Sequence, residues 1–154
     1  MSKVLTLGYE YEHDYHLMAI NSTLDDYRLA YYLNKQLTIH LERQANNIDF
    51  TDKNCSFTWY NYDCNQTFTT WALVANKHVF TTKNTERPTL FAEESKISYL
   101  ISEKKKVDYF LKIFGDFTAE RLIAILEKIK SIKGVVTSYT LNPQTLKSKD
   151  FLIF

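Results

Sequence analysis

Acidic and imidazole side chains gather near the start of the chain, and these residue types bind divalent metal ions in proteins. The cluster consists of Glu10, Glu12, His13, Asp14 and His16. Successive side chains of an extended segment point to opposite sides, so His13 faces away from the other four. The chain also lacks the H-x-x-x-H and H-E-x-x-H spacings that place two ligands on one helical face. We therefore predict a solvated segment here and no metal site.

Nucleophilic catalysis has little support in the sequence. Cys55 and Cys64 are nine residues apart, which matches no two-cysteine metal or redox motif. No G-x-S-x-G motif is present, and His40 and His78 both lie in segments where a structural role is expected. The sequence therefore predicts no catalytic residue, no cofactor and no disulfide.

Aromatic residues near the middle of the chain suggest a binding surface. Four of them fall within a predicted hairpin: Tyr60, Tyr62, Phe68 and Trp71. Tyrosine and tryptophan are frequent hot-spot residues at interfaces. We therefore interpret these residues as an anchor patch for an unknown protein partner or for a second copy of the chain.

Lysines elsewhere in the chain suggest an alternative. Lys104, Lys105 and Lys106 form a run of three like charges, and Lys112 follows them. Sheet aromatics with lysines around them hold single-stranded RNA in other proteins. The chain has no RNP1-like pattern, however, and its net charge is only +1. We rank protein interaction first, RNA binding second and an enzyme of unknown reaction third.

The composition is that of a folded globular protein. Of the 154 residues, 45% are hydrophobic and 24% are charged, which argues against disorder. No apolar run approaches the ~20 residues of a membrane helix. Three glycines are too few for most phosphate-binding loops. Charged residues interrupt the start of the chain before a signal-peptide core can form, so we expect a cytoplasmic protein without membrane contact and with reduced thiols.

Apolar periodicity predicts two amphipathic helices, at residues 24–37 and 119–132, the second preceded by Thr118 as a capping residue. Strands are expected at residues 15–20, 38–43, 56–63, 67–75, 78–82, 97–101, 107–114 and 135–141. Side-chain alternation in residues 56–63 places Phe57 and Trp59 on one face of the sheet and Tyr60 and Tyr62 on the other.

These elements predict a single α+β domain over residues 1–154, because strand-helix units at both ends of the chain enclose antiparallel hairpins. The sheet is expected to be antiparallel-dominated with both helices on one side, and a ferredoxin-like arrangement with extra strands fits this pattern. The predicted core consists of Leu29, Leu33, Leu37, Val107, Leu111, Leu122, Ile125, Leu126 and Ile129.

The segment I-S-E-K-K-K-V-D-Y, residues 101–109, resembles the signature of the I-P-E-x-x-x-V-D-Y family of small Bacteroidetes proteins. Ser102 stands where the family has proline. Residues 26–29 with 33–35, and residues 146–149, are also similar to this family. The resemblance implies a small bacterial protein of the cytoplasm and no particular activity. In physical terms, residues 103–106 form a charged turn and Asp108 can satisfy backbone amides, so we favour a rigid turn over a recognition site.

Overall fold

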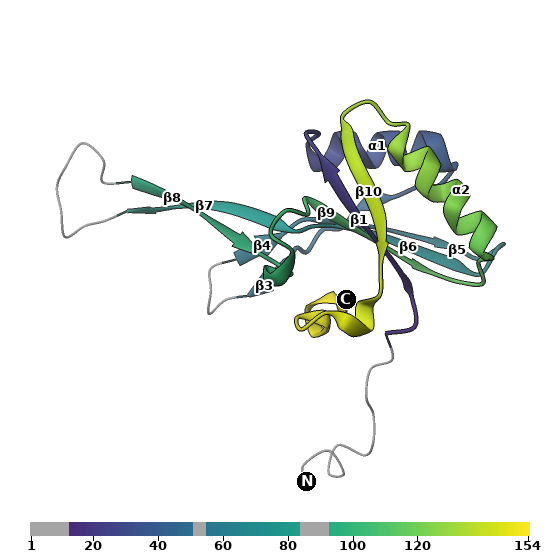
Figure 1. The fold of residues 1–154 in the computed structure, drawn as a ribbon. Helices are drawn as coiled ribbons and strands as arrows, with labels where there is room; N and C mark the ends of the chain where they lie inside the picture. The colour runs from purple at the N-terminus through teal and green to yellow at the C-terminus, as the bar shows by residue number, and fades with distance from the viewer. Residues whose placement is uncertain (1–12, 51–54, 84–92) are drawn as a thin grey trace, which may run out of the picture.

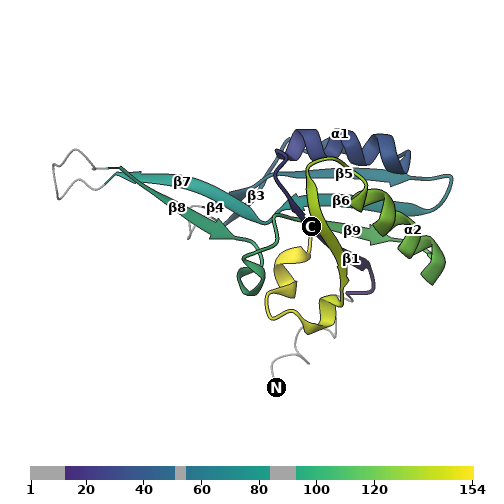
Figure 2. The same cartoon turned by 45° about the horizontal axis from the view of Figure 1, so that its top comes forward.

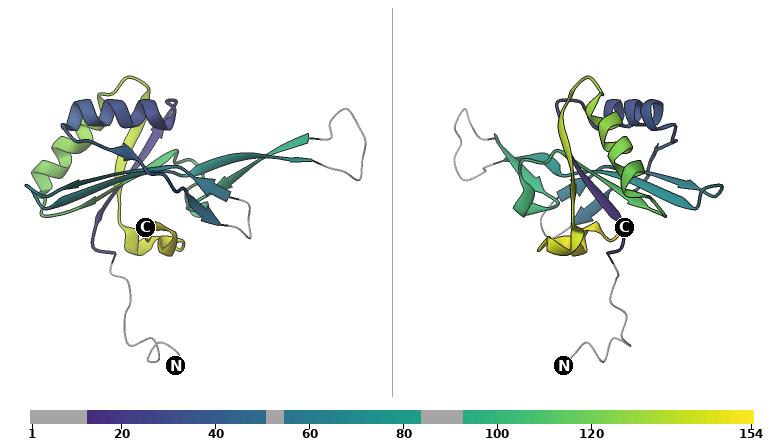
Figure 3. Two further views of the ribbon diagram at one scale, coloured as in Figure 1. Left: turned by 180° about the vertical axis from the view of Figure 1, so that it is seen from behind. Right: turned by 45° about the vertical axis from the view of Figure 1, so that its right-hand side comes forward.

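A six-stranded antiparallel sheet forms the centre of the protein (Figure 1). The computed structural model describes residues 13–50, 55–83 and 93–154. The strands of the main sheet are β1 (His16–Ser22), β2 (Glu42–Arg43), β5 (Trp59–Cys64), β6 (Thr69–Ala75), β9 (Tyr109–Phe114) and β10 (Val135–Leu141). Helices α1 (Asp26–Leu37) and α2 (Ala119–Lys130) cover one face of this sheet (Figure 3). The predicted α+β class, with both helices on one side, is confirmed.

The strand order across the sheet is β10-β1-β9-β6-β5-β2, and each neighbouring pair is antiparallel. It follows that β1 and β6 are parallel with β9 between them, and that β9 and β10 are parallel with β1 between them. The chain passes from β1 through α1 towards β6, and from β9 through α2 to β10. The order β10-β1-β9-β6 is the split β-α-β arrangement of ferredoxin-like folds, and β5 and β2 are the extra strands.

Capping residues fix the ends of both helices. Helix α1 ends at Thr38, which adopts a positive φ of 56° and donates its backbone N–H to the Asn34 carbonyl. Helix α2 begins after Thr118, as predicted, and the Thr118 hydroxyl accepts a hydrogen bond from the Arg121 amide. Gly134 follows α2 with a φ of +105°, which favours glycine and lets the chain turn into β10.

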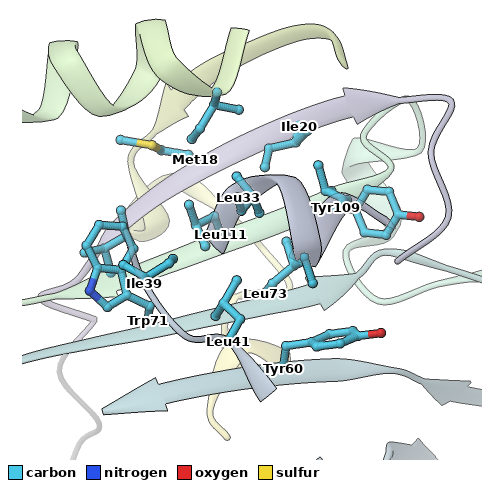
Figure 4. Packing of buried hydrophobic residues seen from close by; sticks show 14 of the residues in the cluster. Met18, Ile20, Leu33, Ile39, Leu41, Tyr60, Trp71, Leu73, Tyr109 and Leu111 are labelled. Atoms are coloured by element: carbon cyan, nitrogen blue, oxygen red, sulfur yellow. The ribbon is translucent and has the colours of Figure 1, made fainter. Parts of the chain in front are cut away.

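The helix-facing side of the sheet holds an apolar core (Figure 4). Leu29 and Leu33 of α1 and Ile125 and Ile129 of α2 are buried in it, as predicted. The strands contribute Met18, Ile20, Tyr60, Trp71, Leu73, Leu111 and Ile113. The predicted core residues Leu37, Leu122 and Leu126 are partly buried and pack against this cluster.

The opposite side of the sheet is covered by irregular segments. These are residues 100–108, which include the 3-10 helix η3 (Ser102–Lys104), and the 3-10 helices η4 (Pro143–Thr145) and η5 (Lys149–Leu152). Val107 is buried as predicted, but in this second core. Phe57 belongs to it and Trp59 packs against it, whereas Tyr60 and Tyr62 face the helices. The predicted alternation of these aromatic side chains is confirmed.

Two short sheets extend from the main one (Figure 2). They pair β3 (Ile48–Phe50) with β4 (Cys55–Phe57), and β7 (Lys77–Lys83) with β8 (Glu93–Tyr99). The strand predicted at residues 56–63 is divided between β4 and β5 at Thr58, whose hydroxyl donates to the Asp26 carboxylate at the start of α1 (2.8 Å).

The strand predicted at residues 38–43 is wrong over most of its length, because only Glu42–Arg43 pairs. Asn34 of α1 explains the difference. Its side chain accepts a hydrogen bond from the Leu41 amide (2.7 Å) and donates one to the Leu41 carbonyl (3.2 Å). These bonds hold the segment against the helix, and Ile39 and Leu41 enter the helix-face core.

Candidate functional site

The four aromatic residues predicted to form one exposed patch do not lie together at the surface. Tyr60 and Trp71 are only 7% and 4% exposed, in the core under the helices (Figure 4). Tyr62 is half-buried beside them, and Phe68 is 87% exposed in the turn before β6. Burial raises the pKa of Tyr60 to about 12, with a further contribution from the Asp26 carboxylate. The predicted patch is therefore wrong, because the face that these residues share is the face that the helices cover.

Lys112, which we grouped with the RNA-binding lysines, is buried as well, with 1% exposed. Its Nζ donates a hydrogen bond of 2.6 Å to the Leu152 carbonyl. The Nζ atom also lies 5.0, 5.3 and 4.0 Å from the ring centroids of Tyr15, Phe114 and Phe154. Burial lowers the pKa of Lys112 to about 8. Its ammonium group therefore holds the segment after β10 on the sheet and is not available to bind RNA.

The residues that match the family signature make structural contacts. Ile101 and Val107 are buried in the second core, at 0% and 1% exposed. The Glu103 carboxylate accepts hydrogen bonds from the Ser148 amide (2.9 Å) and the Ser148 hydroxyl (2.7 Å). These bonds to Ser148 lower the pKa of Glu103 although burial opposes them. The segment is thereby joined to the region between η4 and η5.

Asp108 and Tyr109 join the same segment to the end of β1 and to the loop that follows it. Asp108 Oδ2 accepts from the Ser22 amide (2.8 Å), and Oδ1 accepts from Lys77 Nζ (2.7 Å). The Tyr109 hydroxyl donates to the Leu24 carbonyl (2.7 Å). The expectation that Asp108 satisfies a backbone amide is confirmed, and the amide belongs to β1.

The side chain of Asn76 holds this segment in place by hydrogen bonds, although no pattern in the sequence predicted this role. It lies between β6 and β7 and is 0% exposed. Its Oδ1 accepts from the Ile101 amide (2.8 Å), and its Nδ2 donates to the carbonyls of Lys104 and Val107 (2.9 Å each). The backbone N–H of Asn76 donates a hydrogen bond to the Asp108 carbonyl (2.9 Å). These hydrogen bonds hold residues 101–108 as a turn, which includes the turn predicted at residues 103–106 and extends into both strands predicted beside it.

The lysine run lies on the outer surface of that turn. Lys105 and Lys106 are exposed and Lys104 is partly exposed. Lys105 Nζ lies 5.7 Å from the ring centroid of Tyr99. Residues 102–107 and Tyr139 of β10 line an open cavity of about 400 Å³. Lys104, Lys105 and Lys106 therefore form a positively charged surface with the Tyr99 ring beside it. We call these three residues the lysine turn.

Exposed aromatic side chains gather instead on the outer surface of α1. Tyr27, Tyr31 and Tyr32 are 59%, 61% and 38% exposed. Together with Leu24 and Arg28 they line a hollow of about 520 Å³. The rings of Tyr31 and Tyr32 meet edge to face with centroids 5.3 Å apart, and the Arg28 guanidinium lies 5.9 Å from the Tyr27 ring centroid. We call these five residues the tyrosine patch.

The helical period of residues 24–37 contained the signal for this patch. Tyr27 and Tyr31 fall beside the apolar stripe of the predicted helix, and Tyr32 falls on its polar side. An aromatic residue on the polar side of an amphipathic helix faces solvent unless something else covers it. The sequence therefore contained the signal for this surface, but we assigned the binding surface to the aromatic residues of the predicted hairpin instead.

The described histidines and cysteines form neither a metal site nor a disulfide. His13 is 5% exposed, and its Nδ1 forms a 2.8 Å hydrogen bond with the Tyr15 hydroxyl. Within residues 13–50, 55–83 and 93–154, no group of three or more His, Cys, Asp or Glu side chains is arranged to hold a metal ion, and Glu10 and Glu12 lie outside these ranges. Cys55 and Cys64 form no disulfide.

Cys64 is partly exposed, whereas Cys55 is buried. Hydrogen bonds from Thr67 and Tyr62 lower the pKa of Cys64 to about 7, so it carries more thiolate at neutral pH than an ordinary cysteine. In the part of the chain that the structure describes, neither helix is long and apolar enough to cross a membrane.

Known protein families, curated proteins and solved structures gave no match to this chain. The resemblance to the I-P-E-x-x-x-V-D-Y family therefore stays a prediction. The two surfaces that offer chemistry to a ligand are the tyrosine patch and the lysine turn.

Proposed function

We propose that this protein is a non-catalytic protein-interaction module of the cytoplasm, and that it binds its partner through the tyrosine patch. The observation that carries this proposal is the exposure of three tyrosines around one hollow beside Arg28. Tyrosine and arginine are enriched at the energetic centres of interfaces. Tyrosine also offers a large contact area at a low cost in side-chain entropy, because it has only two side-chain torsions.

The support beneath the patch makes it suitable for binding. Leu29, Ala30 and Leu33 fix the other side of α1 in the core. The helix backbone therefore holds the tyrosines in place before a partner arrives, which reduces the ordering cost of association. The hollow fits an apolar side chain, and Arg28 offers a charged hydrogen bond to a carboxylate. We infer a partner segment that carries an apolar residue next to an acidic one.

The test is capture of partners from native lysate by wild type, Tyr31→Ala and Ile123→Ala. Ile123 is 60% exposed on α2 and is the matched control. We expect one protein to persist after nuclease and at ~200 mM salt, because an apolar interface responds little to ionic strength. The captured protein should bind Tyr31→Ala about tenfold or more weakly than it binds wild type, as is typical when a hot-spot residue is removed.

Two outcomes would contradict the proposal. If Tyr31→Ala and Ile123→Ala retain the partner equally, the tyrosine patch is not the binding surface. If only nuclease-sensitive material is captured, the protein is not a protein-interaction module of this kind.

The cellular location and the family are proposed on separate grounds. Two cysteines without a disulfide are typical of a reducing compartment and support the cytoplasm. Membership of the I-P-E-x-x-x-V-D-Y family is supported by the roles of the matching positions, since Ile101 and Val107 are buried and Glu103 and Asp108 accept backbone hydrogen bonds. The intervening lysines lie at the surface, where residue identity is less constrained.

RNA binding is the second candidate, and the cavity between the lysine turn and Tyr139 favours it. Tyr60, Trp71 and Lys112 no longer support it because they are buried. Affinity for a single-stranded RNA should then fall steeply from ~50 to ~200 mM salt. Replacing Lys104, Lys105 and Lys106 by Gln should reduce the salt slope by about 2–3 units, and an unchanged slope would exclude this surface.

A further inference from the structure

The two edges of the main sheet differ in how they are protected from pairing with another chain. At one edge β2 has only two residues, Glu42 and Arg43, both charged and exposed. At the other edge β10 has seven residues, V-V-T-S-Y-T-L, with no charge and no proline. Short strands, charges and proline are the usual devices that prevent edge-to-edge association. The β10 edge lacks all three, and the β-bulge at Val136, another such device, lies only at its start.

Most of β10 is regular. Residues 137–141 pair with β1 one by one, from Asn21↔Thr137 to Leu17↔Leu141. The register shifts at the start of β10, where Val136 is an extra residue, and Asn142 and Pro143 follow its end. The regular stretch is therefore five residues long and has Tyr139 at its centre.

The backbone of this stretch has donors and acceptors that point away from the sheet. The Ile20 carbonyl accepts a hydrogen bond from the Asp108 amide, so Ile20 directs its backbone groups towards β9. Ser138 lies opposite Ile20 and therefore directs its own N–H and C=O away from β1, and so does Thr140, two residues later. No other strand of the described ranges lies beyond β10 (Figure 3).

We propose that two copies of this chain pair their β10 strands antiparallel about a two-fold axis at Tyr139. Ser138 of each copy then exchanges two backbone hydrogen bonds with the partner's Thr140, and Tyr139 lies against the partner's Tyr139. The main sheet continues from one copy into the other. This inference concerns a different surface from the tyrosine patch and holds or fails independently of it.

The choice of a second copy as occupant follows from charge and symmetry. A two-fold axis brings each residue of the edge close to its own counterpart, so a charged residue near the axis would meet a like charge. The regular stretch contains no charged residue. The same pairing covers Tyr139, which is 37% exposed, with an identical ring as a cross-strand aromatic pair. Because the other edge of the sheet ends in the short, charged strand β2, it does not pair with a further copy, and the assembly stops at a dimer.

The first experiment measures the mass of the full chain by sedimentation from about 1 to about 100 μM, since self-association responds to mass action. We expect a dimer of the 18.2 kDa chain at the upper concentrations and nothing larger. Thr140→Pro removes one outward N–H, a position where an edge strand tolerates proline, and should give a monomer with an unchanged circular dichroism spectrum. Thr140→Val is the matched control and should remain dimeric. Wild type that stays monomeric, or Thr140→Pro that dimerises like wild type, would overturn the proposal.

The second experiment tests the register and does not depend on Thr140→Pro folding. Residues facing each other in a non-hydrogen-bonded antiparallel pair have Cα atoms about 4.5 Å apart, a separation that a disulfide can bridge. In a Cys64→Ser background, Tyr139→Cys should form a disulfide-linked dimer on mild oxidation, whereas Ile123→Cys should not. Equal cross-linking of the two variants, or none, would contradict pairing at Tyr139. Tyr31→Ala should dimerise like wild type, which separates this result from the proposed function.

Discussion

The two faces of the main sheet are covered by different kinds of structure. On one face, α1 and α2 satisfy their own backbone hydrogen bonds and contribute apolar side chains. On the other face, irregular segments leave backbone groups that need partners, and buried polar side chains supply them. Asn76 and Lys112 do this for residues 101–107 and for Leu152. The comparison shows that a face covered by irregular segments needs specific polar contacts, whereas a helix-covered face needs mainly apolar volume.

The largest effect is expected for Asn76→Ala. This change leaves the buried Ile101 amide and the buried Val107 carbonyl without their Asn76 partner, and it removes one of the two hydrogen bonds that the Lys104 carbonyl accepts. We expect a loss of about 4 kcal/mol in the free energy of unfolding, measured by urea denaturation. Asn65→Ala, in the exposed β5–β6 turn, is the control and should change stability by less than about 0.5 kcal/mol. If Asn76→Ala is as mild as its control, the polar contacts do not hold this face together.

A somewhat smaller effect is expected for Leu33→Ala on the helix face. Leu33 is 0% exposed, and its removal leaves a cavity between α1 and the sheet. The expected loss is about 3 kcal/mol in the same denaturation experiment. Leu33→Met preserves volume and should cost less than about 1.5 kcal/mol. A Met variant as damaged as the Ala variant would mean that more than packing volume matters on this face.

The pH dependence of stability should distinguish Lys112→Met from wild type. The folded pKa of Lys112, about 8, is below its unfolded value, so between these values the unfolded chain binds more protons and wild-type stability rises with pH. Relative to the Met variant, wild type should gain about 2 kcal/mol between about pH 7.5 and pH 9.5. The ionisation of tyrosines contributes equally to the pH dependence of both proteins, so it cancels in this difference. A difference that is flat with pH would show that Lys112 is not buried as a charged group.

The smallest effect is expected when Lys104, Lys105 and Lys106 are all replaced by Gln. These side chains lie on the outer surface of a turn that other residues hold in place. The free energy of unfolding should change by less than about 0.5 kcal/mol. Thermal unfolding followed by circular dichroism measures this, and severe unfolding of the variant would show that the lysines support the second face directly.

The apolar residues of the helix-covered face could be predicted from the sequence, whereas on the other face the burial of Val107 could be predicted but the polar contacts of Asn76 and Lys112 could not. The period of 3.6 residues identified Leu29, Leu33, Ile125 and Ile129 because a helix repeats its contacts locally. The role of Asn76 depends on backbone groups 25 to 31 residues away, and no local pattern records them.

The candidate sites show a related limit. Alternation in β5 placed Tyr60 and Tyr62 on the same face, but a period of two residues does not say which face is covered. Lys112 was grouped with the surface lysines because of its charge, although its neighbours in residues 110–114 are all apolar, and its ammonium group finds its partner only when the segment around Leu152 packs on the sheet. Both errors concern contacts between distant parts of the chain.

The position of β1 in the sheet has a consequence for synthesis of the protein. β1 lies between β9 and β10, so its Ile20 pairs with Tyr109 and Ser138. A ribosome adds about 5–20 residues per second, so β1 waits roughly 4–18 s after it is made before β9 follows. During this interval a strand with four consecutive buried apolar residues, Leu17 to Ile20, has neither of its neighbours. Chaperones that bind nascent chains would therefore meet this protein at β1, and release from them would coincide with the synthesis of β9 and β10.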